Sequence, residues 1–185
     1  MIQLTAAALL AFFSCVTTAS AAEWREYAYE ADGFAISQSA VPILQEEERE
    51  SPAGPMHVRH YAFFPGPNGV VFMVSAGTLN ASDKRTAEEI LAFATRNVPE
   101  GAIEYLVQSG AKGVQYGYEK DGGSTLIRVL AAGGHQYVLQ LNGPASAFPH
   151  PDAERWMDSW RLLKPGEKPK GSREIVGVPN GPPTL

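Results

Sequence analysis

The sequence predicts an α+β domain in which an antiparallel sheet of about seven strands is covered by two main helices, as in an α/β/α sandwich. Three observations lead to this prediction. Between residues 113 and 142 the chain reads as consecutive strands joined by glycine-rich turns. A capping box at Thr86 opens one apolar helical stripe. A second stripe, which contains two tryptophans, follows Pro151.

The segment from Gly113 to Asn142 organises the predicted sheet. Tight turns are expected at Asp121-Gly122-Gly123 and at Gly133-Gly134, because glycine readily adopts the positive φ that short hairpin loops require. The strand between these turns, residues 126–132, is apolar at nearly every position except Arg128. We therefore expect a central strand that is covered on both sides, with Arg128 bonded to a partner or placed at an edge.

Earlier parts of the chain show the short alternating runs that are typical of strands. The run 70–74 is apolar at every position and belongs in the middle of a sheet, whereas the glutamates of 46–50 suit an exposed edge. Strands are predicted as a hairpin over 24–37 and as further segments over 43–50, 56–64, 70–78 and 103–108.

Both predicted helices carry an apolar face. In the first, Thr86 accepts from the amide of Glu89, and Glu89 reaches back to the amide of Thr86. Its apolar stripe consists of Ala87, Ile90, Leu91 and Ala94, and the stripe of the second helix consists of Ala153, Trp156, Met157 and Trp160. The tryptophans predict a large buried anchor.

The sequence divides into three parts. Residues 1–21 lack charged side chains. Their apolar run, from Leu4 to Phe13, is too short to span a bilayer and is followed by the small residues Ala19-Ser20-Ala21, a pattern typical of a cleaved export signal. Residues 22–163 are expected to form a single domain, and residues 164–185, rich in proline and glycine, a disordered tail. We therefore expect a periplasmic or extracellular protein without a membrane span. Lipid attachment at Cys15 is an open alternative.

Charge and cysteine content exclude several classes of function. Residues 22–163 carry 11 basic and 18 acidic side chains, so this domain repels phosphate backbones and nucleic acid is not an expected partner. The only cysteine, Cys15, lies in the export signal, which excludes thiol catalysis in the mature chain. No phosphate loop, dinucleotide fingerprint or nucleophile elbow occurs, and no cofactor is expected.

Two short motifs have the residue types of a catalytic or metal site but not the geometry that such a site requires. Ser109-Gly110-Ala111-Lys112 has the spacing of serine enzymes that use a lysine, but it lies between strands and not at the start of a helix. His57 and His60 face opposite sides of a strand, so they cannot chelate one metal ion. We expect no catalytic and no metal-binding residue, although an enzyme whose site is assembled from distant residues stays possible.

Aromatic side chains give the candidate binding residues. Tyrosines on several strands could stack on a ligand, since they present an apolar ring with a polar tip. The candidates for ligand binding are Tyr61, Tyr116, Tyr118, Tyr137 and Arg128. Half-buried packing in the sheet is the alternative role of these tyrosines.

Several positions together resemble one known fold group. They are the opening Trp24-x-x-Tyr27, the turn Asp32-Gly33-Phe34, Pro42, and Trp160-Arg161-Leu162-Leu163 after the second helix. The group is the α/β/α sandwich of the photosystem II oxygen-evolving-enhancer protein, a yeast regulator of the Ran GTPase and small exported bacterial proteins. This resemblance implies a non-catalytic binding or accessory module. We therefore expect an exported module that binds a protein partner or a small apolar ligand, with a hydrolase-type enzyme or a lipid-anchored envelope protein as alternatives.

Overall fold

The computed structural model describes residues 23–51, 54–64, 68–80, 83–164 and 166–167. The predictions for the export signal, for Cys15 and for most of the C-terminal tail lie outside these residues. The described strands are β1 Arg25–Tyr29, β2 Phe34–Gln38, β3 Ile43–Ser51, β4 Gly54–Phe63, β5 Val71–Thr78, β6 Glu104–Gln108, β7 Ala111–Lys120, β8 Gly123–Ala132, β9 His135–Pro144 and β10 Arg161–Leu162. The helices are α1 Ala87–Thr95 and α2 Ala153–Asp158, with 3-10 turns η1 Glu30–Asp32, η2 Glu100–Ala102 and η3 Ala145–Ala147.

The main sheet has seven antiparallel strands in the order β3-β4-β5-β9-β8-β7-β6, which confirms the predicted fold class. As predicted, β8 is central and the glutamate-rich β3 is an edge. The turns Asp121-Gly122 and Gly133-Gly134 have positive φ at all four residues, as the sequence predicts for two-residue hairpin loops. The central hairpins are therefore fixed by local sequence.

The hairpin of residues 24–37 does not join this sheet. Its strands β1 and β2 form a separate three-stranded sheet with β10, in which β2 is central. Phe34, Ala35 and Ile36 have no exposed surface, and the ring of Phe34 contacts Tyr61 and Tyr137 of the main sheet as well as Trp160. The small sheet thus forms a layer that the sequence did not predict.

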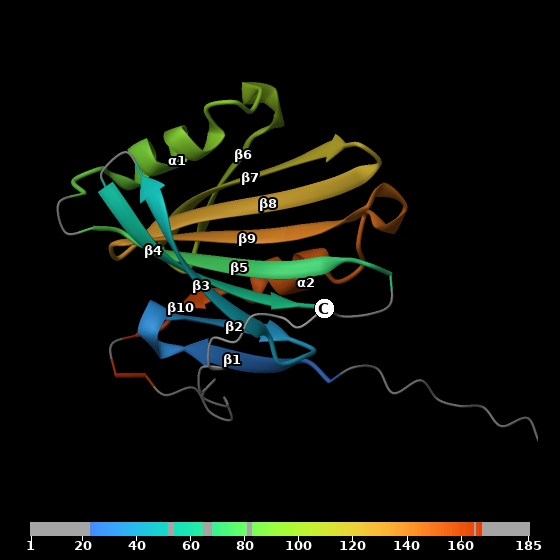
Figure 1. Cartoon of the computed structure of the whole chain (residues 1–185), viewed down its shortest axis with the longest axis horizontal. Coiled ribbons are helices and arrows are strands. Elements are labelled where there is room, and N and C mark those ends of the chain that lie inside the picture. Colours follow the sequence, from blue (N-terminus) through green and yellow to red (C-terminus); the bar gives the residue numbers. More distant parts are fainter. Residues whose placement is uncertain (1–22, 52–53, 65–67, 81–82, 165, 168–185) are drawn as a thin grey trace, which may run out of the picture.

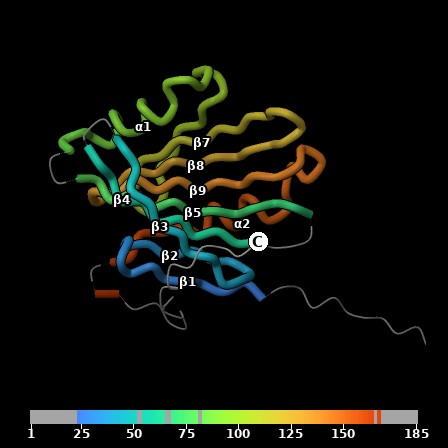
Figure 2. Tube along the Cα trace, in the orientation of Figure 1, coloured from blue at the N-terminus to red at the C-terminus, as the bar shows by residue number. Residues whose placement is uncertain are grey.

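Side chains of the main sheet alternate between two faces. The inner face, which carries Tyr61, Phe72 and Tyr137, packs on the small sheet and α2. The outer face, which carries Val114 and Val129, packs on α1. Figure 1 shows α1 at the β7 and β8 side of the main sheet and the β1-β2-β10 layer at the opposite side. The Cα trace in Figure 2 shows the long β7-β8 ribbon extending beyond α1.

Each helix anchors one face of the sheet. The capping box of α1 is present, with both hydrogen bonds between Thr86 and Glu89. Ile90 and Leu91 of this helix pack on the outer face. On the inner face, Trp156 of α2 and Trp160 just after it are almost fully buried, which confirms the predicted anchor. None of the helices in the described part of the chain is long and apolar enough to cross a bilayer.

Candidate functional site

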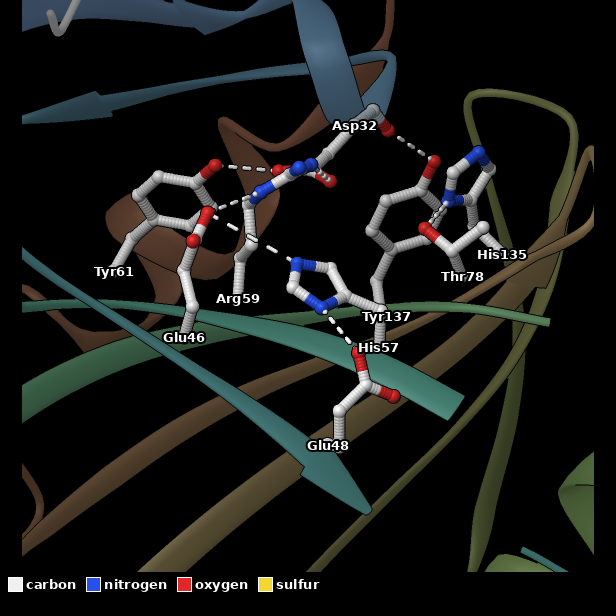
Figure 3. Close-up of polar contacts among 9 residues, drawn as sticks. All are labelled: Asp32, Glu46, Glu48, His57, Arg59, Tyr61, Thr78, His135 and Tyr137. Atoms are coloured by element: carbon white, nitrogen blue, oxygen red, sulfur yellow. Dashed lines mark hydrogen bonds and ion pairs between the residues drawn. The ribbon is translucent and has the colours of Figure 1, made fainter. Parts of the chain in front are cut away.

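A buried carboxylate joins the two sheets. Asp32, at the end of η1, has no exposed surface and accepts from Arg59 Nη1 at 2.8 Å and from the Tyr61 hydroxyl at 2.5 Å. Its backbone oxygen accepts from the Tyr137 hydroxyl at 2.7 Å. Figure 3 shows these side chains reaching Asp32 from β4 and β9. The positive charge of Arg59 and the hydrogen bonds together offset the free-energy cost of removing this carboxylate from water.

The network continues from Asp32 to the surface. Arg59 also donates to Glu46 on β3 at 2.7 Å, and this bond is the main reason that the pKa of Arg59 is raised. His57 Nδ1 lies 2.9 Å from an oxygen of Glu48, and its other nitrogen lies 3.9 Å from Glu46. The exposed end of the network is therefore a line of hydrogen-bonded polar side chains along β3 and β4 (Figure 3).

This network accounts for two of the predicted binding tyrosines. Tyr61 and Tyr137 are 5% and 1% exposed, and the hydroxyls of both donate hydrogen bonds to Asp32. Burial, and for Tyr61 also the bond to Asp32, raises the pKa of each phenol. The structure thus places these rings in the core between the sheets, away from Tyr116 and Tyr118.

Alkaline pH is expected to unfold the protein through these tyrosines. Burial raises the pKa of Tyr29, Tyr61 and Tyr137 above the ordinary value of about 10. Above pH of about 10, the folded chain keeps phenol protons that the unfolded chain releases. The free energy of unfolding that these tyrosines contribute is therefore fully present below pH of about 10 and declines as the pH rises further. Tyrosinate absorbance and far-ultraviolet circular dichroism should change together for these groups. Ionisation of all seven tyrosines near their ordinary pKa in a folded protein would contradict this expectation.

Arg128, which was expected to be bonded to a partner or placed at an edge, has three hydrogen-bond partners. It is 8% exposed and donates to Gln115, Gln108 and Asp158, each at 2.8 Å. Gln108 in turn donates to the backbone oxygens of Met157 and Trp160. The structure therefore gives Arg128 a role in tying β8 to the end of α2.

Tyr116 and Tyr118 lie at a different place, where two cavities approach each other across the end of β7. The inner cavity, of about 730 Å³, is open on the inner face and is lined by residues that include Gln115, Glu119, Leu126, Phe148 and Glu154. The outer cavity, of about 340 Å³, lies between β7 and the end of α1. Gly117 and Tyr118 line both cavities, and Tyr116 lines the outer one. We take the two cavities as the candidate binding site.

Sequence reasoning identified the tyrosines of this site but not its other wall. Phe148 and His150 come from the segment that leads into α2 and Glu154 from the first turn of α2, and the fold alone brings them to the end of β7 and β8. The only available signal was the pair of prolines at 149 and 151, which marks a rigid loop before the helix.

A chain of polar side chains on the outer face has the residue types of a hydrolytic triad. His60 Nδ1 lies 2.7 Å from Ser75 Oγ, and His60 Nε2 lies 3.2 Å from Glu47. The bond to His60 is also the main reason that the pKa of Glu47 is lowered. However, Ser75 is 7% exposed and lies in the middle of β5, which is paired on both sides. The surrounding backbone amides are engaged in the sheet, so they are not free to stabilise an oxyanion. The contacts of Glu47, His60 and Ser75 therefore link the side chains of β3, β4 and β5.

The other short motifs do not assemble a site. Ser109 lies in the turn between β6 and β7, where its hydroxyl accepts from the amide of Leu162 at 3.1 Å. Lys112 instead pairs with Glu88 of α1. His57 contacts Glu48 on one face of the sheet, whereas His60 contacts Ser75 on the other. The two histidines therefore point to opposite faces, as the strand periodicity requires.

Comparison with known proteins gives similarity in structure and none in sequence. No family model and no curated protein matches the chain. The solution structure of cyanobacterial PsbP (CyanoP) from Synechocystis is similar, with a TM-score of 0.49, 11% identity, and coverage of 82% of this chain and 99% of that one. A crystal structure from Bacteroides thetaiotaomicron has a TM-score of 0.47 and 15% identity, and covers 77% of this chain and 50% of that one.

Proposed function

We propose that this protein is an exported, non-enzymatic module that binds a protein partner or a small apolar ligand at the end of its β7-β8 ribbon. The observation that carries this proposal is the pair of cavities that share Gly117 and Tyr118. The inner cavity has the volume of a typical ligand site and combines apolar walls with a few polar groups. Export is proposed from the uncharged, apolar N-terminal segment.

The character of the other polar clusters supports a binding role. Asp32, Arg59 and the tyrosines bonded to Asp32 are engaged with one another inside the fold. Ser75 is likewise engaged with His60. By contrast, Tyr118 is 50% exposed beside two cavities, and an exposed aromatic ring at a cavity rim is a common binding anchor.

Binding of the neutral fluorescent probe N-phenyl-1-naphthylamine tests the proposal. We expect saturable binding to the full-length gene product. Tyr118→Ala should raise Kd roughly five-fold, since loss of about 1 kcal/mol of aromatic contact has that effect. Tyr105→Ala is the matched control, because Tyr105 is a 71% exposed tyrosine of β6 that lines neither cavity. Absence of saturable binding, or an equal effect of both variants, would refute the cavities as a site for a small apolar ligand.

A further inference from the structure

Strand β7 changes from a central strand to an edge strand along its length. Strand β6 pairs with β7 only from Ala111 to Gln115, whereas β8 pairs with it from Lys112 to Lys120. Beyond Gln115, no strand of the described chain pairs with the outer side of β7. Residues 117–120 are exposed. This edge therefore presents backbone groups that another strand can pair with.

The hairpin turns determine which backbone groups point outward. Lys120 and Gly123 flank a two-residue loop, so they form a hydrogen-bonded pair, and the pattern alternates from there. Residues 116, 118 and 120 thus bond to β8, and the backbone N–H and C=O groups of Gly117 and Glu119 point away from it. The loop between Gln108 and Ala111 gives the same alternation on the β6 side. Gly117 and Glu119 are accordingly the free positions of this edge.

The two cavities lie on either side of this edge. Gln115 and Glu119 line the inner cavity, Tyr116 lines the outer cavity, and Gly117 and Tyr118 border both. Side chains of an added strand would also alternate between the two faces. Those opposite Gly117 and Glu119 would enter the inner cavity, and those between them would enter the outer cavity. Backbone pairing with pockets for alternate side chains is the geometry of strand addition.

The charges of the cavities indicate which side chains fit. The inner cavity is lined by two carboxylates, Glu119 and Glu154, and by no lysine or arginine of the described chain. Leu126 and Phe148 offer apolar surface beside them, which suits the stem of a lysine. The outer cavity is lined by aliphatic residues such as Val98, and by no charged side chain of the described residues.

We propose that an extended segment of a partner protein adds to β7 as an antiparallel strand, with basic side chains in the inner cavity and aliphatic side chains in the outer one. This proposal rests on the function proposed above and specifies the ligand of the same site. The edge strand β3 is different: by the same hairpin rule its outward positions include Glu46, Glu48 and Glu50, and charged edges discourage pairing. The end of β7, by contrast, has a cavity on each face.

A synthetic peptide and its backbone-methylated forms test the proposal. The probe is fluorescein-labelled Thr-Val-Lys-Val-Lys-Val-Thr, with its carboxyl end amidated, and its binding to the full-length gene product is measured by anisotropy. The lysine residues should pair with Gly117 and Glu119, so N-methylation of both lysines should weaken binding by at least about ten-fold. A second peptide is N-methylated at two valines instead. It has the same side chains and the same number of methyl groups as the first, but its methyl groups block only amides that point away from β7. This second form should bind like the parent peptide.

Variants of the protein test the same edge from the other side. Glu119→Pro removes an outward N–H without removing a bond to β8, and it should weaken peptide binding by about ten-fold. Glu50→Pro is the matched control, because Glu50 is an outward glutamate of β3 that lies opposite Pro55. Glu119→Gln should weaken binding less, since it removes charge but keeps the backbone donor. The methylated peptides need no variant, so the test holds even if Glu119→Pro fails to fold.

The possible outcomes separate the two proposals. Equal binding of both methylated peptides would overturn strand addition in favour of binding through side chains alone. Binding of N-phenyl-1-naphthylamine without binding of the peptide would also overturn strand addition, while the cavities would stand as a site for an apolar ligand. Failure of both probes would refute the binding function itself.

Discussion

Asp32→Ala is expected to lower the free energy of unfolding by about 2–4 kcal/mol, because it removes a fully buried carboxylate and leaves the buried Tyr61 hydroxyl without its acceptor. Asp32 is fully buried and accepts from Arg59 and from the Tyr61 hydroxyl. Without it, the Tyr61 hydroxyl would lose its acceptor, and Arg59 would keep only the bond to Glu46. The loss follows from these unpaired groups and from the cavity left between the sheets.

Urea unfolding followed by far-ultraviolet circular dichroism measures this loss. Glu23→Ala is the matched control, since Glu23 also pairs with an arginine but is 74% exposed, and solvent screens exposed pairs so that they contribute little to stability. Asp32→Asn should fall between the two, because the amide oxygen still accepts one hydrogen bond. If Asp32→Ala and Glu23→Ala shifted the urea midpoint equally, the buried network would not be what joins the two sheets.

Trp156→Ala is expected to destabilise the fold by a similar amount, about 3–5 kcal/mol, because it empties a large volume in the core. Trp156 has no exposed surface and packs edge-on against Phe72, with ring centroids 5.1 Å apart. It also contacts Phe63 at 6.1 Å. The indole thus links α2 to β4 and β5, and its loss would loosen α2 from the sheet.

Two further variants separate volume from polarity at this site. The Nε1 atom of Trp156 has no hydrogen-bond partner among the described residues. Trp156→Phe removes this unpaired donor while it keeps an aromatic ring, so its cost should be only about 1–2 kcal/mol. Trp24→Ala is the control, because Trp24 is only partly buried beside Arg155. Equal loss in Trp156→Ala and Trp24→Ala, measured by circular dichroism in urea, would contradict the anchoring role of α2.

The prediction from sequence was most complete where the determinants are local. The turns at Asp121-Gly122 and Gly133-Gly134 and the capping box at Thr86 each depend on a few neighbouring residues, and all are present. The edge position of β3 also followed from its own glutamates. The candidate site was only partly predictable. Tyr118 was one of several strand tyrosines that the sequence offered as ligand-binding candidates, whereas Phe148 and Glu154 reach the site through the packing of α2.

The tyrosines show the limit of sequence reasoning. Tyr61, Tyr116, Tyr118 and Tyr137 all lie on strands with similar local patterns, so periodicity cannot tell a core tyrosine from a cavity tyrosine. The difference comes from Asp32, which lies far away in the sequence and accepts from Tyr61 and, through its backbone oxygen, from Tyr137. Tyr118 has no such neighbour in the described structure and borders two cavities instead.

The sequence alone determined the fold class, the main hairpins and the two apolar helix faces, because periodicity, turn residues and caps act over short distances along the chain. Only the tertiary structure decided that the first hairpin forms its own sheet, that Asp32 is buried between the layers, and that β6 ends short of the free edge at Gly117. These features depend on contacts between distant segments, whose pairing is set by the packing of the whole core.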